Sequence, residues 1–278
     1  EEVGLTDDFT LELWANPLLN YESAHIVHQR GQNSGYVLGL DPALIRAALQ
    51  LNGTDEYVHA AIAPWYSKSF TLELWLKPSM AEQPSAPGLF SSTEVAGAND
   101  ALCLTLNADG TYLLQHATGS LTLGAAEPVW HHLAISYDGQ TLRAYVDAQL
   151  VAEVEENDHT YGFQAYLLGT NVNRDTFFAG QFDELRLWSY ARGLQALASE
   201  RHTRMQGDEP GLHSYYRFDL TKALDLTGRA ENGTYHGTPA VVTTHSALQG
   251  FRLVAGVARA RGDASKRTPG TVAELQTR

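Results

Sequence analysis

Acids and histidines are the side chains of this sequence that could perform acid–base chemistry. Glycoside hydrolysis needs two carboxylates about 5–10 Å apart across a sugar site. Glu73 shares its predicted strand face with Thr71 rather than with a second acid, and the acidic run 153–158 ends a predicted strand at a solvated edge. The sequence contains no Gly-x-Ser-x-Gly nucleophile elbow and no glycine-rich phosphate loop. We therefore predict that the chain is not an enzyme, and Glu153 and Glu155 are the acids to replace in a test for a divergent glycosidase.

Two adjacent histidines, His131 and His132, follow Trp130 at the start of a predicted strand. Because successive side chains of a strand point to opposite faces, these two imidazoles cannot chelate one metal ion, and we predict a structural role for them. Cys103 is the only cysteine of the chain, which excludes an intramolecular disulfide and a cysteine-based zinc site.

The chain is acidic, with a net charge of −13 from 19 Lys and Arg against 32 Asp and Glu. This charge repels phosphate backbones and anionic membrane surfaces, so we expect no nucleic-acid partner. We also expect no membrane insertion, because no apolar run approaches the roughly 20 residues of a membrane-spanning helix. Residues 251–278 are the exception, since they form a basic tail with six Lys and Arg against two acids.

Alternation of apolar and polar residues with a period of two dominates the chain. Six runs with this pattern are typical of short strands: residues 70–76, 101–106, 111–115, 132–137, 142–146 and 182–188. The pairs Asp109-Gly110 and Asp138-Gly139 predict tight hairpin turns, because glycine accepts the positive φ that such turns need. Only residues 191–206 have a helical pattern. The sequence therefore predicts an all-β, antiparallel sandwich or barrel with one short helix near 191–206.

A nine-residue motif occurs twice, in residues 9–17 and 70–78, with seven identical positions and an offset of 61. The unit that follows the second copy is longer than this offset, so we interpret the first copy as part of an incomplete unit. The predicted organisation is a partial preceding unit at 1–45, a complete unit at 46–222, a connecting segment or the start of a next unit at 223–250, and a basic tail or the start of a further module at 251–278. The alternative is one larger sandwich in which a strand motif recurs.

Four segments in the same order and spacing resemble a laminin G-like jelly-roll domain of the concanavalin A-like lectin/glucanase superfamily, which has pentraxins among its members. They are residues 48–58, 70–75, 130–139 and 180–188. The resemblance implies an antiparallel jelly-roll β-sandwich, and we expect Trp75, Trp130 and Trp188 to fill the space between its two sheets. Glucanases of the superfamily carry their carboxylates as Glu-x-Asp-x-x-Glu, a pattern that this sequence lacks.

The resemblance to pentraxins also implies a calcium site. Pentraxins hold calcium with an Asp-Asn pair before one strand and an acid-rich loop after a Leu-Gly pair, and calcium takes roughly six to eight oxygen ligands. The matching positions are Asn99, Asp100, Asn171, Asn173 and Asp175. Amides in place of carboxylates would lower the affinity for calcium. The alternative is that these residues only form turns, which Asn and Asp favour.

Two aromatic residues precede the second of these loops. We predict Tyr161 and Phe163 as rings that stack on a sugar, with Asn171 as a further ligand-binding residue; a place in the core is the alternative for both rings.

These features predict a non-catalytic recognition or adhesion module of a larger modular protein, extracellular or at the cell surface. It would bind a glycan or an extracellular protein through loops at one edge of the sandwich, with calcium as the predicted cofactor. Neighbouring domains of the same parent protein are further expected partners. The alternative function is a structural spacer or assembly domain of a surface or toxin protein, without a small ligand.

Overall fold

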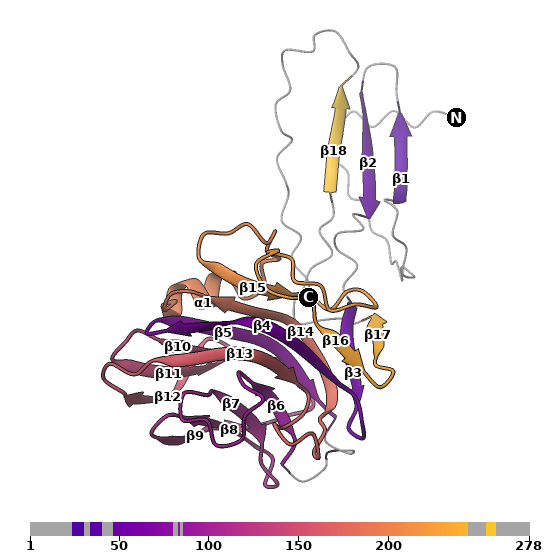
Figure 1. Ribbon diagram of the computed structural model, residues 1–278. Helices are drawn as coiled ribbons and strands as arrows, with labels where there is room; N and C mark the ends of the chain where they lie inside the picture. The colour runs from indigo at the N-terminus through magenta and orange to yellow at the C-terminus, as the bar shows by residue number, and fades with distance from the viewer. Residues whose placement is uncertain are drawn as a thin grey trace. The chain divides into compact units, whose positions relative to one another are not determined.

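The structure is a computed structural model that describes residues 24–30, 34–40, 47–79, 83, 86–243 and 254–259, with side chains described between residues 47 and 243. The chain forms two compact units, residues 1–45 with 250–278 and residues 46–249. The larger unit is a sandwich of two antiparallel β-sheets, which confirms the predicted jelly-roll class (Figure 1). Among the described residues, no helix has the length and apolar character needed to cross a bilayer.

One sheet of the sandwich has seven strands in the order β16-β4-β13-β6-β7-β8-β9. Its strands are β4 (Tyr57–Ser67), β6 (Gly88–Ser91), β7 (Cys103–Leu106), β8 (Thr111–His116), β9 (Gly119–Ala125), β13 (Tyr161–Leu168) and β16 (Thr234–His236). Alternate residues of β4 show how it faces the other sheet: Val58, Ala60 and Ile62 are buried in the core, whereas His59 between them is partly exposed.

The other sheet has eight strands in the order β12-β11-β10-β5-β14-β3-β17, with β15 also paired to β14. Its strands are β3 (Ala47–Asn52), β5 (Phe70–Pro78), β10 (His131–Tyr137), β11 (Thr141–Val146), β12 (Gln149–Glu155), β14 (Ala179–Trp188), β15 (Leu212–Tyr216) and β17 (Ala240–Thr243). Strand β5 lies between β10 and β14, so both of its edges are paired.

Both predicted Asp-Gly turns connect antiparallel hairpins. Gly110, between β7 and β8, has a φ of 80°, and Gly139, between β10 and β11, has a φ of 93°. Both values lie in the left-handed region that glycine adopts without strain, which confirms the sequence-based prediction of these two hairpins.

The main core lies between the two sheets, but the three tryptophans that we expected to fill it lie elsewhere, Trp130 packing against Trp75. Leu72, Leu74 and Leu76 of β5 join the main hydrophobic cluster. Trp75 and Trp188 are buried in separate small clusters, so our expectation that they fill the space between the sheets is wrong. The physical reason is that β5 is buried on both faces, and alternation places Trp75 on the face opposite to the leucines.

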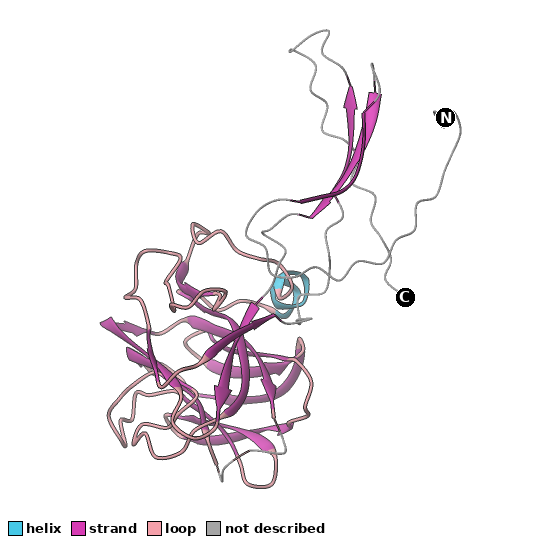
Figure 2. Ribbon diagram, turned by 90° about the vertical axis from the view of Figure 1, so that its right-hand side faces the viewer, coloured by secondary structure: helices cyan, strands magenta, loops and turns pink. Residues whose placement is uncertain are grey.

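The helix α1 (Leu194–Glu200), drawn in cyan in Figure 2, lies within the predicted segment 191–206. Its N-cap residue Gly193 provides no side-chain hydrogen bond, and a helix of this length is marginal by itself. Leu197 packs against Ala134 of β10 and Tyr145 of β11. Tertiary packing onto the eight-stranded sheet therefore holds α1 in place.

The C-terminal part of the larger unit completes both sheets. Strand β16 pairs with β4 and β17 pairs with β3, so residues 223–243 contribute strands to the sandwich. The compact unit thus extends to residue 249 rather than ending at residue 222.

In the smaller unit, β1 (Ala24–Arg30), β2 (Ser34–Leu40) and β18 (Val254–Arg259) form a three-stranded antiparallel sheet. Segments from the predicted partial unit at 1–45 and from the predicted basic tail are therefore paired with each other. The first copy of the repeat, residues 9–17, lies outside the described residues.

Candidate functional site

The outer face of the eight-stranded sheet has two parts. Strand β5 directs four side chains to this face: Thr71, Glu73, Trp75 and Lys77. Residues 190–201, which include α1, cover the first three of them; Trp75 Nε1, for example, donates a hydrogen bond to the carbonyl oxygen of Arg201 at 3.0 Å. We call this the covered half. Lys77, with Gln181 and Gln50 on the neighbouring strands, belongs to the part that these residues do not cover, which we call the open half.

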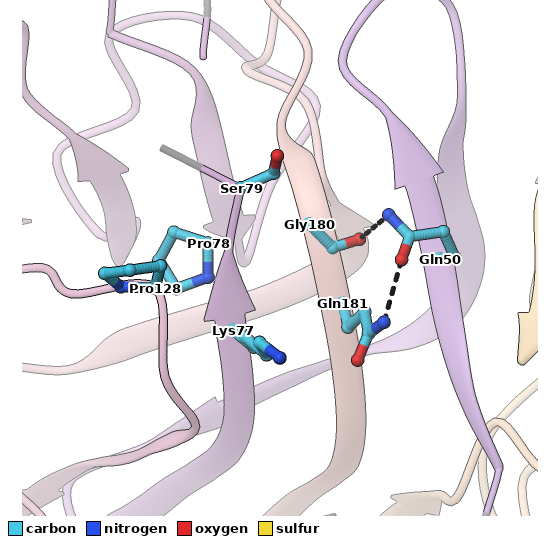
Figure 3. A pocket seen from close by; sticks show the side chains of 7 residues that line it. All are labelled: Gln50, Lys77, Pro78, Ser79, Pro128, Gly180 and Gln181. Carbon is cyan, nitrogen blue, oxygen red and sulfur yellow. Dashed lines mark hydrogen bonds between the residues drawn. The ribbon is translucent and has the colours of Figure 1, made fainter. Parts of the chain in front are cut away.

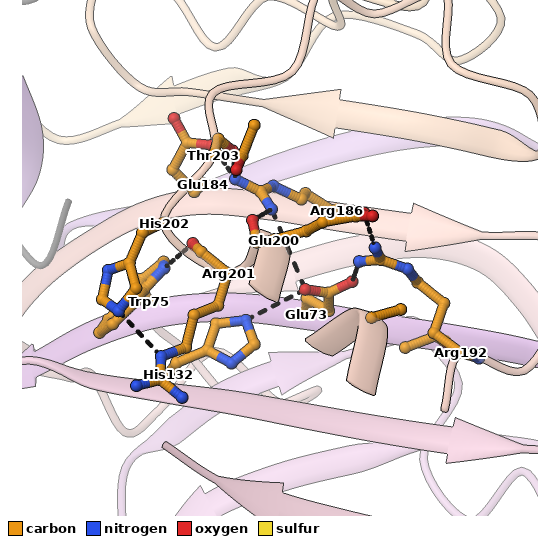
Figure 4. A network of polar contacts seen from close by, with 12 residues as sticks. Glu73, Trp75, His132, Glu184, Arg186, Arg192, Glu200, Arg201, His202 and Thr203 are labelled. Atoms are coloured by element: carbon orange, nitrogen blue, oxygen red, sulfur yellow. Dashed lines mark hydrogen bonds and ion pairs between the residues drawn. The ribbon is translucent and has the colours of Figure 1, made fainter. Parts of the chain in front are cut away.

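Glu73 is the central acid of the covered half and has no exposed surface (Figure 4). His132 Nε2 lies 3.1 Å from Glu73 Oε2, and Arg186 Nη1 lies 4.0 Å from the same oxygen. Arg192 donates a hydrogen bond to the other carboxylate oxygen. The negative charge of Glu73 is therefore compensated by two buried arginines.

A bulge in β14 brings further ions to this face. The register of β14 against β5 shifts here, and Glu184 has a φ of 52° in the left-handed region. Arg186 Nη2 donates to Glu184 at 2.5 Å, and Arg192 pairs with Glu200 of α1. The ion pairs thus connect the sheet to the helix that covers it.

The electrostatics of this network oppose a catalytic role for Glu73. Burial alone would raise the pKa of the Glu73 carboxyl, but the hydrogen bond from His132 and the charges of Arg186 and Arg192 outweigh it and lower the pKa from 4.5 to about 2. Burial lowers the pKa of His132, so we assign it as neutral at pH 7, donating through Nε2–H. A buried carboxylate that stays ionised and paired cannot exchange protons with a substrate. Glu73 therefore anchors the cover of the sheet.

The predicted calcium ligands lie near opposite ends of β13. The carbonyl oxygen of Asp100 accepts a hydrogen bond from the Gly162 N–H at 2.8 Å, near the start of the strand. The loop with Asn171, Asn173 and Asp175 follows the end of the strand at Leu168. Gly162 and Leu168 are six positions apart, which is about 20 Å at about 3.3 Å per residue. Asp100 and its exposed neighbour Asn99 therefore cannot share one ion with this loop.

In the second group of predicted ligands, Asn171 and Asp175 bind each other. Asn171 Nδ2 donates to Asp175 Oδ1 at 2.6 Å, and the Asp175 N–H donates to Asn171 Oδ1 at 3.2 Å, while Asn173 is exposed. Within the described part of the chain, no three His, Cys, Asp or Glu side chains form a group that could hold a metal ion. The five predicted residues do not fit a single calcium site, and Asn171 and Asp175 form a turn.

The loop between β6 and β7, which holds Asp100, does meet the loop after β13, but through residues other than the predicted ligands. Arg174 Nη2 lies 2.6 Å from Glu94 Oε2, and His59 Nε2 of β4 lies 2.5 Å from Glu94 Oε1. Burial would raise the pKa of Glu94, yet its hydrogen bonds with Arg174 and His59 lower it overall. The cation that bridges these loops is therefore a guanidinium of the chain itself.

Tyr161 and Phe163 have no exposed surface. The Tyr161 hydroxyl donates a hydrogen bond to the carboxylate of Glu156, and the Phe163 ring packs edge-on against Phe70 with 5.1 Å between centroids. Both side chains belong to the main core, because these alternate positions of β13 face the other sheet. Neither ring can stack on a sugar here, and the core is their place in the fold.

Four side chains form a row on the open half. Gln181 of β14 lies opposite Lys77 of β5 on one side and opposite Gln50 of β3 on the other. The register of β10 against β5, continued one residue beyond its last pair, places Trp130 on the other side of Lys77. The order is thus Trp130, Lys77, Gln181 and Gln50, which we call the polar row. Three strand spacings of about 4.8 Å make it about 14 Å long.

The last three residues of the polar row line a depression of about 510 Å³ (Figure 3). Its other lining residues are Pro78, Ser79, Pro128 and Gly180. Gln181 Nε2 donates to Gln50 Oε1 at 2.9 Å, and Gln50 Nε2 donates to the Gly180 carbonyl oxygen at 3.1 Å. These bonds orient the amides and leave Gln181 with its Oε1 and one N–H without a partner among the described residues.

The chemistry of this depression suits binding rather than catalysis. Gln181 can both donate to and accept from a hydroxyl group, and Pro128 presents an exposed apolar surface beside it. Trp130, at the end of the polar row, is half-buried and packs against Trp75. The described lining residues include no carboxylate, histidine or cysteine. The depression can therefore hold a polar ligand with an apolar face, and its described lining lacks the pair of carboxylates that glycoside hydrolysis needs.

Sequence reasoning missed the residues of this site. Gln50, Lys77 and Gln181 lie on three different strands, and nothing in their local sequence marks them as ligands. The only available signal was that each is a polar residue at an outward position of a strand, and this does not show that the three come together.

The family described as the concanavalin A-like lectin/glucanases superfamily, laminin G type, matches residues 52–198, which is more than half of the chain. No curated protein sequence matches the chain.

Two solved structures are similar in fold. A protein of Bacteroides ovatus ATCC 8483 that is proposed to bind carbohydrate superposes with a TM-score of 0.55 and 20% identity, over 72% of this chain and 63% of that one. The heptameric SAP-like pentraxin of Limulus polyphemus has a TM-score of 0.50 and 13% identity, over 72% of this chain and 96% of that one. The chain thus spans less than two thirds of the Bacteroides protein, and both similarities concern the fold.

Proposed function

Because the chain belongs to the concanavalin A-like lectin/glucanases superfamily, we propose that it is a non-catalytic carbohydrate-binding module whose sugar site is the open half of the eight-stranded sheet. The proposal moves the site from the loops at the edge of the sandwich to a sheet face. It is supported by the fold shared with the Bacteroides protein, which is itself proposed to bind carbohydrate.

The observation that carries the proposal is the polar row beside the depression. Amide side chains match the paired donor and acceptor character of sugar hydroxyls, and aromatic and proline surfaces match the apolar faces of sugar rings. The hydrogen bonds from Gln181 to Gln50 and from Gln50 to Gly180 hold the amides in place before a ligand arrives. Such preorganisation lowers the entropic cost of binding. At about 14 Å, the row is long enough for an oligosaccharide to lie across the strands.

The test is a glycan array followed by titration calorimetry of the full chain with the best ligand. Gln181→Ala removes the one amide with free donor and acceptor groups, and we expect the affinity to fall about tenfold, the effect of one lost hydrogen bond of about 1.4 kcal/mol. The matched control is Gln195→Ala, an exposed position on α1, which should bind as the wild type does. The bound oligosaccharide should be recovered uncleaved.

Two results would contradict the proposal. If the wild type binds a glycan and Gln181→Ala binds it equally well, the site lies elsewhere. If the folded wild type binds no glycan at all, the alternative of a spacer or assembly domain without a small ligand is favoured.

A further inference from the structure

Lys77 is the one charged side chain among the described residues that line the depression. It is half-buried, and no hydrogen bond or ion pair joins its ammonium group to another described residue. Lys68, at the opposite end of β5, shows the usual arrangement, since its ammonium group lies 2.5 Å from the carboxylate of Asp158. Within the described part of the chain, Lys77 is therefore a half-buried cation without a counter-ion.

The described residues that flank Lys77 on the outer face of the sheet are uncharged. Gln181 lies across from it on β14, Trp130 lies on the side of β10, and Trp75 and Ser79 precede and follow it on the same face of the chain. In Figure 3 the ammonium nitrogen of Lys77 lies on the side of the strand that faces Gln181. A charge that is partly removed from water and has no partner retains most of its capacity to bind an anion. The depression thus presents one positive charge beside neutral hydrogen-bonding groups.

The surrounding protein limits the kind of anion. The chain carries a net charge of −13, which repels a densely charged polyanion such as a nucleic acid. A ligand with a single anionic substituent and many hydroxyl groups meets less repulsion, and it can use Gln181 and Gln50 as well as Lys77. A sugar ring that bears a carboxylate or a sulfate has this combination.

We propose that the depression selects an acidic sugar, with the ammonium group of Lys77 paired to the anionic substituent and the amide of Gln181 bound to a hydroxyl group of the same chain. This inference rests on the proposed carbohydrate-binding function and specifies its ligand class. Carboxylate and sulfate share the chemistry that Lys77 recognises, so the experiment has to separate the two.

The experiment uses an array in which each acidic glycan is printed beside its uncharged counterpart: uronic and sialic acids beside their methyl esters, and sulfated glycans beside the desulfated forms. The full-length wild type should bind an acidic glycan at least about tenfold more tightly than the uncharged form, as expected for a charge-assisted hydrogen bond. If esterification abolishes the preference, the recognised anion is a carboxylate. If desulfation abolishes it, the anion is a sulfate. Added salt should weaken this preference, because it screens the ion pair.

Three variants complete the test. Lys77→Gln should lose the preference for the acidic form and retain the weaker binding of the uncharged form. Lys77→Arg should keep the preference, because the positive charge remains, and Lys68→Gln should behave as the wild type does. Thermal unfolding of each variant controls for folding.

Each outcome decides a separate point. Equal binding of acidic and uncharged glycans by the wild type overturns the inference and leaves the carbohydrate-binding function standing. A preference for acidic glycans that survives in Lys77→Gln also overturns it, because another cation is then responsible. Binding of no glycan at all overturns both proposals.

Discussion

Replacement of Glu73 by glutamine removes one charge from the covered half of the eight-stranded sheet and preserves the shape of the side chain. The remaining partner of Arg192 is Glu200, whose side chain is 46% exposed and which is thus a weaker counter-ion. Arg186 retains its pair with Glu184 at 2.5 Å. We therefore expect Glu73→Gln to fold and to be less stable than the wild type at pH 7.

The pKa of Glu73 sets the size of this effect. It falls from 4.5 to about 2 in the folded protein, and each pKa unit corresponds to about 1.4 kcal/mol, so ionised Glu73 contributes about 3 kcal/mol to the free energy of unfolding. Because the folded pKa is depressed, the contribution is fully present above pH 4.5 and is lost as the pH falls through about 2. A loss of about 3 kcal/mol is also typical of breaking a buried ion pair.

Urea denaturation of the wild type and Glu73→Gln at pH 7 and pH 3 measures the effect. We expect the variant to lose about 3 kcal/mol at pH 7 and about 1 kcal/mol at pH 3, where part of the contribution of Glu73 has already gone from the wild type. The matched control is Glu155→Gln, at an exposed position of β12, which should change stability little at either pH. Amide exchange in α1 should also become faster in Glu73→Gln, because the helix loses part of its link to the sheet.

Two results would refute this reasoning. If Glu73→Gln is as stable as the wild type at pH 7, the ion pairs of the covered half do not stabilise the fold. If the loss is equal at pH 7 and pH 3, it reflects altered packing rather than the charge of Glu73.

Two further predictions concern the loop that follows β13. Gly88→Ala should lower the free energy of unfolding in urea by about 1–3 kcal/mol, because the new Cβ would lie 2.3 Å from backbone atoms of Thr170; Gly119→Ala, where the nearest atom is 4.0 Å away, is the control and should change little. A calorimetric titration with calcium should give no saturable heat, because Arg174 and Glu94 already bridge the two loops; a saturable signal would contradict the geometry described for them.

Much of the fold could be predicted because its signals are local. Period-two alternation follows from strand geometry, and the Gly110 and Gly139 turns need only a residue that tolerates positive φ. These features depend on residues adjacent in sequence, so they can be recognised without knowing where the strands pair. The helix near 191–206 was recognisable for the same reason.

The environment of each strand face was not predictable from this pattern. Alternation correctly separates Trp75 from Leu74 and Leu76, yet it does not tell which side of the strand meets the other sheet. On β5 both sides are buried, one by the opposite sheet and one by residues 190–201. Large apolar residues therefore occur on both sides, and the rule that the apolar face is the core face fails.

The predicted calcium ligands and sugar-stacking rings were wrong for a related reason, because local sequence does not give the position of a residue in the fold. The resemblance to pentraxins grouped Asp100 with Asp175, but Asp100 lies near the start of β13 and Asp175 lies beyond its end. Tyr161 and Phe163 have rings that suit stacking on a sugar, but their strand directs both rings into the core.

The sequence by itself determined the class of this protein: an acidic, all-β chain of the concanavalin A-like superfamily without a recognisable catalytic motif. Only the tertiary structure decided which residues meet. Gln50, Lys77, Trp130 and Gln181 are separated by up to 131 positions, and they come together because four strands pair in one particular register. Register depends on the packing of a whole sheet against its core, so no local pattern in the chain could have revealed this row.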